Sequence, residues 1–143
     1  MALDTNGMAP LLQVYDMPEA LAFYRDVLGF EVVSASPETD TPEGRFSHFM
    51  WLRLGPADVM LNSAYDEGER PPARDGAQQR WHGDTRLYFG VADADAVYEE
   101  LKSKLPNLKP PKNAPYGMRQ LYLKDPDGYE LCFQAAVGSK VTD

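Results

Sequence analysis

The first half of the chain alternates short apolar runs with a stretch whose apolar positions follow helical spacing. The first run ends at Asp16, a residue type that caps helix N-termini, and the helical stretch ends at Gly29, a common C-terminal stop. Two later runs flank a turn at Gly55, as in a β-hairpin. The pattern predicts, in order, a strand at 10–15, a helix at 16–29 and strands at 30–35, 46–54 and 59–63.

The second half repeats this order of elements. Asp93 can cap a helix that ends at Pro106, and the DPDG sequence at 125–128 is a strong turn signal. The pattern predicts a strand at 86–91, a helix at 93–105 and strands at 107–109, 118–123 and 129–134. Such repetition is typical of a duplicated module.

Each half is therefore predicted to be a βαβββ module, which gives an α+β fold. One such unit has a single helix over a small sheet, so two must combine to cover a common core. We expect one domain over residues 1–143, with modules at 9–63 and 84–135. Residues 64–83 are rich in Gly, Pro, Arg and Asp and are predicted to be a long linker loop.

Composition and charge exclude some classes of protein. Apolar residues make up 43% of the chain, which is ordinary for a protein that buries a core. The net charge of −8 comes from an acidic excess within residues 1–70. Nucleic acid is not an expected partner, because phosphate binding needs a basic face. The acidity either favours a cationic small ligand or is simply a solvated surface.

The chain lacks the features of membrane and secreted proteins. No apolar run approaches the roughly 20 residues that span a bilayer, and the N-terminal sequence lacks the basic and apolar regions of a signal peptide. Cys132 is the one cysteine, so no internal disulfide can form, as is usual in a reducing compartment. We therefore expect a cytoplasmic protein with no membrane partner.

Three motifs resemble those of a known family. The first is LLQVYDMPEALAFYRDVLGFEVV, with Asp16, Phe23-Tyr24 and Leu28-Gly29-Phe30; the others are Tyr116-Gly117 and the DPDG turn. In this order, on a repeated βαβββ pattern, residues 9–135 resemble the glyoxalase / bleomycin resistance protein / extradiol dioxygenase superfamily, also called vicinal oxygen chelate. The resemblance implies two modules whose curved mixed sheets enclose a cup, in a protein that is usually a homodimer.

Enzymes of this superfamily hold a divalent metal ion in the cup with His, Gln or Glu side chains from four strands. The matching positions in this chain are Ala9, Met60 or Asn62, Leu87 and Cys132. One thiol and one amide are not enough, because hard divalent ions prefer carboxylate, imidazole or water, and zinc needs three or four donors. The resemblance thus implies no metal and no other cofactor, as in metal-free bleomycin resistance proteins, which bind ligand without turnover.

The predicted pocket combines aromatic and polar side chains at the strand positions that face the cup. Aromatic faces in a concave site bind flat or cationic ligands, although each ring by itself could equally fill the core. Gln13, Asn62 and Gln120 share this parity as polar groups. The predicted ligand-binding residues are Phe49, Trp51, Asn62, Leu87, Phe89, Tyr122 and Cys132.

The two histidines are His48 and His82. His48 has the helix-facing parity of its strand, which predicts a packed or edge residue, and a register shift of one residue would reverse this. His82 lies in the linker, where it could form a relocated metal site with Asp84. Neither histidine has a local partner to orient it for nucleophilic catalysis, and Cys132 is expected to be a buried, unreactive thiol.

These observations favour a metal-free protein that binds a small apolar or aromatic molecule, cationic ones included, in the cup. The expected partners are that ligand and a second copy of the chain. Whether a reaction is catalysed stays open, and no catalytic residue is predicted. The alternative is a metal-dependent lyase, isomerase or dioxygenase of the same superfamily with non-standard ligands, for which His48 or His82 would be essential. A third hypothesis is a binding or dimerisation module of a larger pathway, for which no small ligand would shift the melting temperature.

Overall fold

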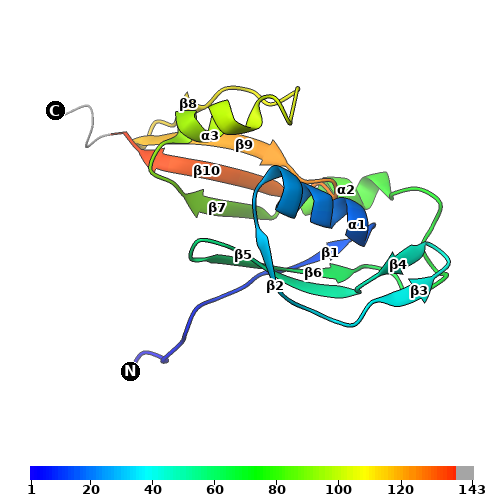
Figure 1. Ribbon diagram of the computed structural model, residues 1–143. Helices are drawn as coiled ribbons and strands as arrows, with labels where there is room; N and C mark the ends of the chain where they lie inside the picture. The colour runs from blue at the N-terminus through cyan, green and yellow to red at the C-terminus, as the bar shows by residue number, and fades with distance from the viewer. Residues whose placement is uncertain (138–143) are drawn as a thin grey trace. The chain divides into compact units, whose positions relative to one another are not determined.

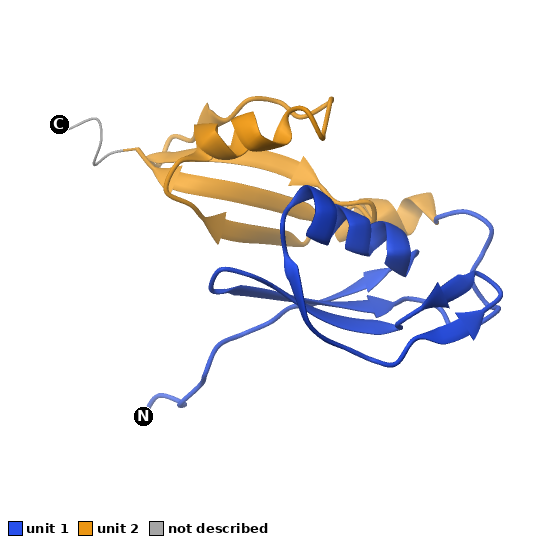
Figure 2. Ribbon diagram, in the orientation of Figure 1, with its two compact units in different colours: residues 1–74 blue, residues 75–143 orange. Residues whose placement is uncertain are grey.

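Strand pairing gives the two halves of the chain the same sheet topology. The computed structural model describes residues 1–137 and divides into unit 1, residues 1–74, and unit 2, residues 75–143 (Figure 2). The sheet of unit 1 has the order β1 (Leu11–Val14), β6 (Ala57–Ser63), β5 (Phe49–Leu54), β2 (Glu31–Ala35). The sheet of unit 2 has the order β7 (Arg86–Gly90), β10 (Glu130–Ala136), β9 (Met118–Lys124), β8 (Lys112–Asn113).

Both sheets are mixed and curved. In each one, the first strand along the chain pairs in parallel with the last, and the other neighbouring strands are antiparallel (Figure 1). This arrangement confirms the predicted α+β fold class. The boundary between the two units falls within the predicted linker at 64–83.

Unit 1 places its helix between β1 and β2. Helix α1 (Met17–Leu21) continues into the π-helical turn η1 (Ala22–Val27). The helix begins as predicted, because the Asp16 carboxylate accepts the backbone N–H of Glu19 at 3.1 Å. The helical segment ends at Val27, and the chain then turns at Gly29, whose φ of +90° disfavours any residue with a Cβ. A separate hairpin of β3 (Thr39–Thr41) and β4 (Gly44–Phe46) precedes β5.

Alternate positions on the strands of unit 1 are buried. Tyr24 and Phe30 are fully buried near the helix, and their rings meet edge to face with centroids 5.5 Å apart. The buried residues of the four-stranded sheet are Leu12, Val14, Met50, Leu52, Val59 and Leu61. The opposite face of this sheet carries Gln13, Phe49, Trp51, Met60 and Asn62. That is the parity predicted to line the cup.

Within its described residues, unit 2 has two helices, α2 (Gly76–His82) and α3 (Ala94–Leu101). Asp93 caps α3 as predicted, accepting the N–H groups of Asp95 at 3.0 Å and Ala96 at 3.2 Å. Helix α3 lies along β9 and β10 (Figure 1), over a buried apolar face that includes Leu121, Leu131 and Phe133. Neither α3 nor any other helix in the described part of the chain is long and apolar enough to cross a membrane.

Two segments of unit 2 differ from the prediction. The predicted linker loop contains α2, a helix with no buried residue, so no apolar periodicity marks it in the sequence. It is held instead by tertiary contacts, among them the hydrogen bond from Gln79 Nε2 to the Pro126 carbonyl at 2.8 Å. The strand predicted at 107–109 is β8, at 112–113, because residues 105–108 form a turn closed by the hydrogen bond from Leu108 N–H to the Leu105 carbonyl at 3.0 Å.

Candidate functional site

The face of the unit 2 sheet that lies away from its buried apolar side carries a row of polar and aromatic side chains. Cys132 pairs with Tyr122 on one neighbouring strand and with Tyr88 on the other, so these three share a face. Residues two positions along each strand share it as well. They are Arg86, Gln120, Lys124, Glu130 and Gln134.

Hydrogen bonds join several of these side chains into one network. The Tyr122 hydroxyl lies within hydrogen-bond distance of Gln120 Oε1, at 3.2 Å, and of the Tyr88 hydroxyl, at 3.3 Å. Gln120 Nε2 in turn donates to Gln134 Oε1 at 2.9 Å and to the Tyr116 hydroxyl at 2.8 Å. Gln120 is only 6% exposed, and both ends of its amide are satisfied. The network therefore fixes the positions of its polar groups before any ligand arrives.

The environment keeps two acidic groups of this face protonated. The hydrogen bond with Tyr88, followed by burial, raises the pKa of Tyr122 well above its ordinary value. Burial also raises the pKa of the Cys132 thiol, and Cys132 is fully buried as predicted. At neutral pH, Tyr122 therefore keeps its hydroxyl proton, and Cys132 is a thiol rather than a nucleophilic thiolate.

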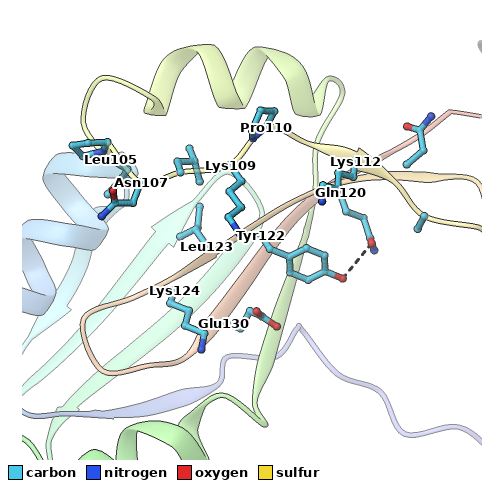
Figure 3. Close-up of a pocket in the computed structure, with 14 residues that line it drawn as sticks. Leu105, Asn107, Lys109, Pro110, Lys112, Gln120, Tyr122, Leu123, Lys124 and Glu130 are labelled. Carbon is cyan, nitrogen blue, oxygen red and sulfur yellow. Dashed lines mark hydrogen bonds between the residues drawn. The ribbon is translucent and has the colours of Figure 1, made fainter.

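A pocket of about 670 Å³ adjoins this network (Figure 3). One wall is the segment 105–114, and the other is formed by β9 with Glu130 at the start of β10. Gln120 and Tyr122 belong to both the pocket and the network. Figure 3 draws the hydrogen bond between them as a dashed line. The pocket has the size of sites that hold small organic molecules and is built within unit 2.

The prediction that Leu87 and Phe89 share a face with Tyr122 and Cys132 is wrong. Register pairs Leu87 with Leu131 and Phe89 with Phe133, which places both on the buried apolar face. Phe89 is 8% exposed and stacks on Phe133, with ring centroids 5.0 Å apart. We predicted the positions on β7 by counting back from Asp93, and the count was wrong by one residue. A shift of one residue moves a side chain to the opposite face of the sheet.

In unit 1 the structure brings the three predicted site residues together on one face. Phe49 pairs directly with Asn62, and Trp51 lies two positions along the same strand. Asn62 Nδ2 donates to Gln13 Oε1 at 3.2 Å across the parallel pair. The hydrogen-bonded Arg53 guanidinium lowers the pKa of the neighbouring Asp58 carboxyl. This face therefore combines two aromatic rings with an amide pair.

His48 has partners that were not predicted. Its Nδ1 lies 3.0 Å from Ser63 Oγ, and its Nε2 lies 3.6 Å from a carboxylate oxygen of Glu67. A second pocket of about 460 Å³ is lined by these three residues together with Asn62, Tyr65 and Asp66. Ser63 could have been predicted from the hairpin, because the pairing of β5 with β6 places position 48 opposite position 63. Glu67 lies in the loop after β6 and gave no such signal.

His82 has a different position. Its ring stacks on Tyr129 with centroids 4.1 Å apart, Nδ1 lies 2.7 Å from the Asp127 carbonyl, and Nε2 lies 3.3 Å from the Tyr129 hydroxyl. Both ring nitrogens thus have protein partners that hold α2 against the turn at 125–128. This arrangement does not fit the role of metal ligand that His82 has in the alternative hypothesis.

The sequence model of the Glyoxalase/Bleomycin resistance protein/Dioxygenase superfamily matches residues 8–133. The chain belongs to this superfamily. The fold is similar to that of TnmS3, an antibiotic binding protein from Streptomyces sp. CB03234, at 24% identity, covering 95% of this chain and 98% of that one with a TM-score of 0.66. No curated protein matches the chain.

Two further solved structures have the same fold. Lactoylglutathione lyase from Agrobacterium tumefaciens is 20% identical, covering 96% of this chain and 97% of that one, with a TM-score of 0.64. The bleomycin-binding protein of Streptomyces verticillus, complexed with copper(II)-bleomycin, is 21% identical, covering 96% and 99%, with a TM-score of 0.62. The superfamily fold is thus found both in proteins named as enzymes and in proteins named as binders.

The side chains present do not fit the divalent metal of the superfamily's enzymes. The matching positions hold Ala9, Met60 or Asn62, and Cys132, and the register of β7 puts Arg86 and Tyr88 on the same sheet face as Cys132 in place of Leu87. Arginine and a protonated hydroxyl are poor ligands for such an ion. Within residues 1–137, no three His, Cys, Asp or Glu side chains are grouped closely enough to hold a metal.

Proposed function

We propose that this superfamily member binds a small apolar or aromatic molecule without a metal ion and without converting it. The pocket of about 670 Å³ beside the Tyr122–Gln120 network is the observation that carries the proposal. Its walls offer apolar area from Leu105 and Leu108, and the polar groups of Gln120 and Tyr122 are already fixed by hydrogen bonds. A preformed pocket of this kind binds by burial of apolar surface and needs no catalytic group.

Exposed aromatic side chains next to the network support the same proposal. Tyr88 is 48% exposed and Tyr116 is 67% exposed, although both hydroxyls are hydrogen-bonded within the network. Rings held in place by their hydroxyls lose little conformational freedom when a flat ligand stacks on them. We propose that Phe49, Trp51 and Asn62 of unit 1 also contribute to ligand binding. The antibiotic binders among the fold neighbours make sequestration of a natural product a compatible biological role.

The proposal extends to the setting of the protein. We propose a homodimer in the cytoplasm, as the superfamily resemblance and the single cysteine suggest. The second copy is expected to complete the cup rather than to supply a metal ligand. Size-exclusion chromatography with light scattering gives the mass of the particle.

Replacing Tyr122 with alanine is expected to weaken binding of a neutral aromatic probe, N-phenyl-naphthylamine, by about tenfold, because a large part of the pocket's apolar area is removed. The probe becomes fluorescent in apolar sites, so titration gives the dissociation constant directly. Tyr98→Ala is the matched control, since Tyr98 is also a half-buried tyrosine of unit 2 but lies on α3 and outside the pocket.

Both tyrosine variants are expected to lose a similar stability of about 1 kcal/mol, which separates binding from folding. Equal affinities of Tyr122→Ala and Tyr98→Ala for the probe would contradict the proposed pocket. The same titration on Trp51→Ala reports whether the face of unit 1 takes part.

Elemental analysis tests the metal-free part of the proposal. We expect untagged protein, produced with added zinc, nickel, manganese and iron and desalted without chelator, to hold less than about a tenth of an equivalent of any metal. The reason is the donor set, in which no matching position carries a histidine or carboxylate. One equivalent per chain would instead favour the metal-dependent enzyme, and His48→Ala and His82→Ala would then locate the ion.

A further inference from the structure

Unpaired positive charge gathers around the pocket of unit 2. Lys109, Lys112 and Lys124 all line it. No carboxylate within the described residues forms an ion pair with any of their three ammonium groups. The arginines nearby differ, since Arg86 pairs with Glu130 and Arg119 pairs with Asp95, each at 2.7 Å. Lys109, Lys112 and Lys124 thus bring to the pocket positive charge without an ion-pair partner in the described part of the chain.

The three lysines come from different elements. Lys109 belongs to the segment 105–114, Lys112 to β8 and Lys124 to the end of β9. In Figure 3 the Lys109 side chain extends from its segment toward β9, while Lys112 and Lys124 lie on either side of Tyr122. Charges that approach one space from several directions attract an anion more strongly than the same charges spread over a surface.

The acidic residue of the pocket does not cancel this charge. Glu130 is the lining carboxylate, and its Oε1 lies 2.7 Å from Arg86 Nε across the parallel strands. The lining thus has three lysines without partners against one carboxylate already neutralised by an arginine. The net charge of the whole chain is −8, so the charge of the pocket lining is opposite in sign to the charge of the protein.

Apolar side chains complete the lining. Leu105, Leu108 and Leu123 contribute aliphatic surface, and lysine stems can extend over such surface while the ammonium group stays in water. A ligand that matches both features has an apolar or aromatic body and an anionic group at its edge. A cationic ligand, which the overall acidity favoured, would meet repulsion here.

We propose that this pocket selects aromatic or apolar molecules that carry an anionic oxygen group, such as a carboxylate or sulfonate, and that Lys109, Lys112 and Lys124 provide the selection. The inference rests on the proposed function, because it names the ligand class of the same site. Carboxylates and sulfonates share this chemistry, since each presents negatively charged oxygens to ammonium groups.

Two fluorescent probes test the inference directly. Anilinonaphthalene sulfonate has the aromatic skeleton of N-phenyl-naphthylamine with one added sulfonate, so the ratio of their affinities isolates the anionic group. We expect the wild-type protein to bind the sulfonate about tenfold more tightly, since each partly exposed charge pair contributes a fraction of a kcal/mol and three act together. The triple variant K109Q/K112Q/K124Q is expected to lose this preference, so that its affinities for the two probes agree within about twofold.

The control is the double variant K102Q/K104Q, which removes charge from exposed lysines of unit 2 outside the pocket and should keep the preference. Rising potassium chloride should weaken sulfonate binding to the wild type and leave the triple variant nearly unaffected. Thermal unfolding of each variant confirms that the exposed substitutions leave the fold intact.

Each outcome has a distinct meaning. Failure of both probes to bind the wild type would overturn the proposed function together with the inference. Binding of the neutral probe without a preference for the sulfonate would overturn the inference alone, and so would equal losses for the triple and double variants. Tighter binding of the cationic dye thioflavin T than of the sulfonate would overturn it as well.

Discussion

Replacing Gly128 with alanine is expected to lower the free energy of unfolding by about 3 kcal/mol. Gly128 has a φ of +90°, and a Cβ built on it would lie 2.5 Å from the backbone carbonyl oxygen of Gln79 in α2. The clash involves backbone rather than a flexible side chain, so the turn or the helix must move. Moving the helix would weaken the hydrogen bond from Gln79 Nε2 to the Pro126 carbonyl, at 2.8 Å, and the contact of His82 with the Asp127 carbonyl, at 2.7 Å.

Gly117→Ala is the matched control for this variant. Gly117 has a similar φ of +84°, but no atom lies within 4 Å of the added Cβ. We expect Gly117→Ala to lower the free energy of unfolding by about 1 kcal/mol, which is the cost of holding a residue with a Cβ at positive φ without any steric clash. Urea denaturation followed by circular dichroism gives both values. Equal losses would mean that α2 yields to the added methyl group without loss of stability and that its close approach to the turn is unimportant.

Replacing Asp125 with alanine is expected to lower the free energy of unfolding by about 3 kcal/mol, because two buried N–H groups lose their acceptor. Asp125 is 6% exposed, and its Oδ1 accepts from the backbone N–H groups of Asp127 at 2.9 Å and Tyr129 at 3.0 Å. These bonds shape the turn that joins β9 to β10, so the positions of Lys124 and Glu130 at the pocket depend on them.

Asp125→Asn separates the acceptor from the charge. The amide keeps an oxygen at the same place, so we expect it to retain most of the stability and to lose about 1 kcal/mol. Neutral-probe affinity should follow the same order, with the alanine variant weaker than the asparagine variant. If both substitutions destabilise equally, the negative charge of Asp125 rather than its acceptor geometry holds the turn.

Local sequence signals predicted most of the architecture. Asp16 and Asp93 cap their helices by the hydrogen bonds expected of them, because a cap involves only residues within the next turn. The turn at 125–128 and the strands on either side of it follow from turn chemistry in the same way. Helix α2 escaped prediction because it has no buried residue and is held by contacts with a turn more than 40 positions away in sequence.

The site was predicted only in part. Alternation on β5 and β6 correctly put Phe49, Trp51 and Asn62 on one face, because the hairpin fixes their register. On β7 no hairpin gives the register, since the strand pairs in parallel with β10 across the length of the unit. Counting from Asp93 was then one residue out, and Leu87 and Phe89 were placed on the wrong face.

The sequence by itself determined the type and order of the elements of the two βαβββ modules, the superfamily, and the absence of histidine or carboxylate at the positions that match the metal ligands. Only the tertiary structure decided which side chains meet. The Tyr88–Tyr122 contact joins strands 34 positions apart, and the hydrogen bond from Gln79 to the Pro126 carbonyl joins segments 47 positions apart. Contacts of this kind depend on strand register and loop packing. Both are decided by which side chains each unit buries, and neither produces a periodic pattern in the local sequence.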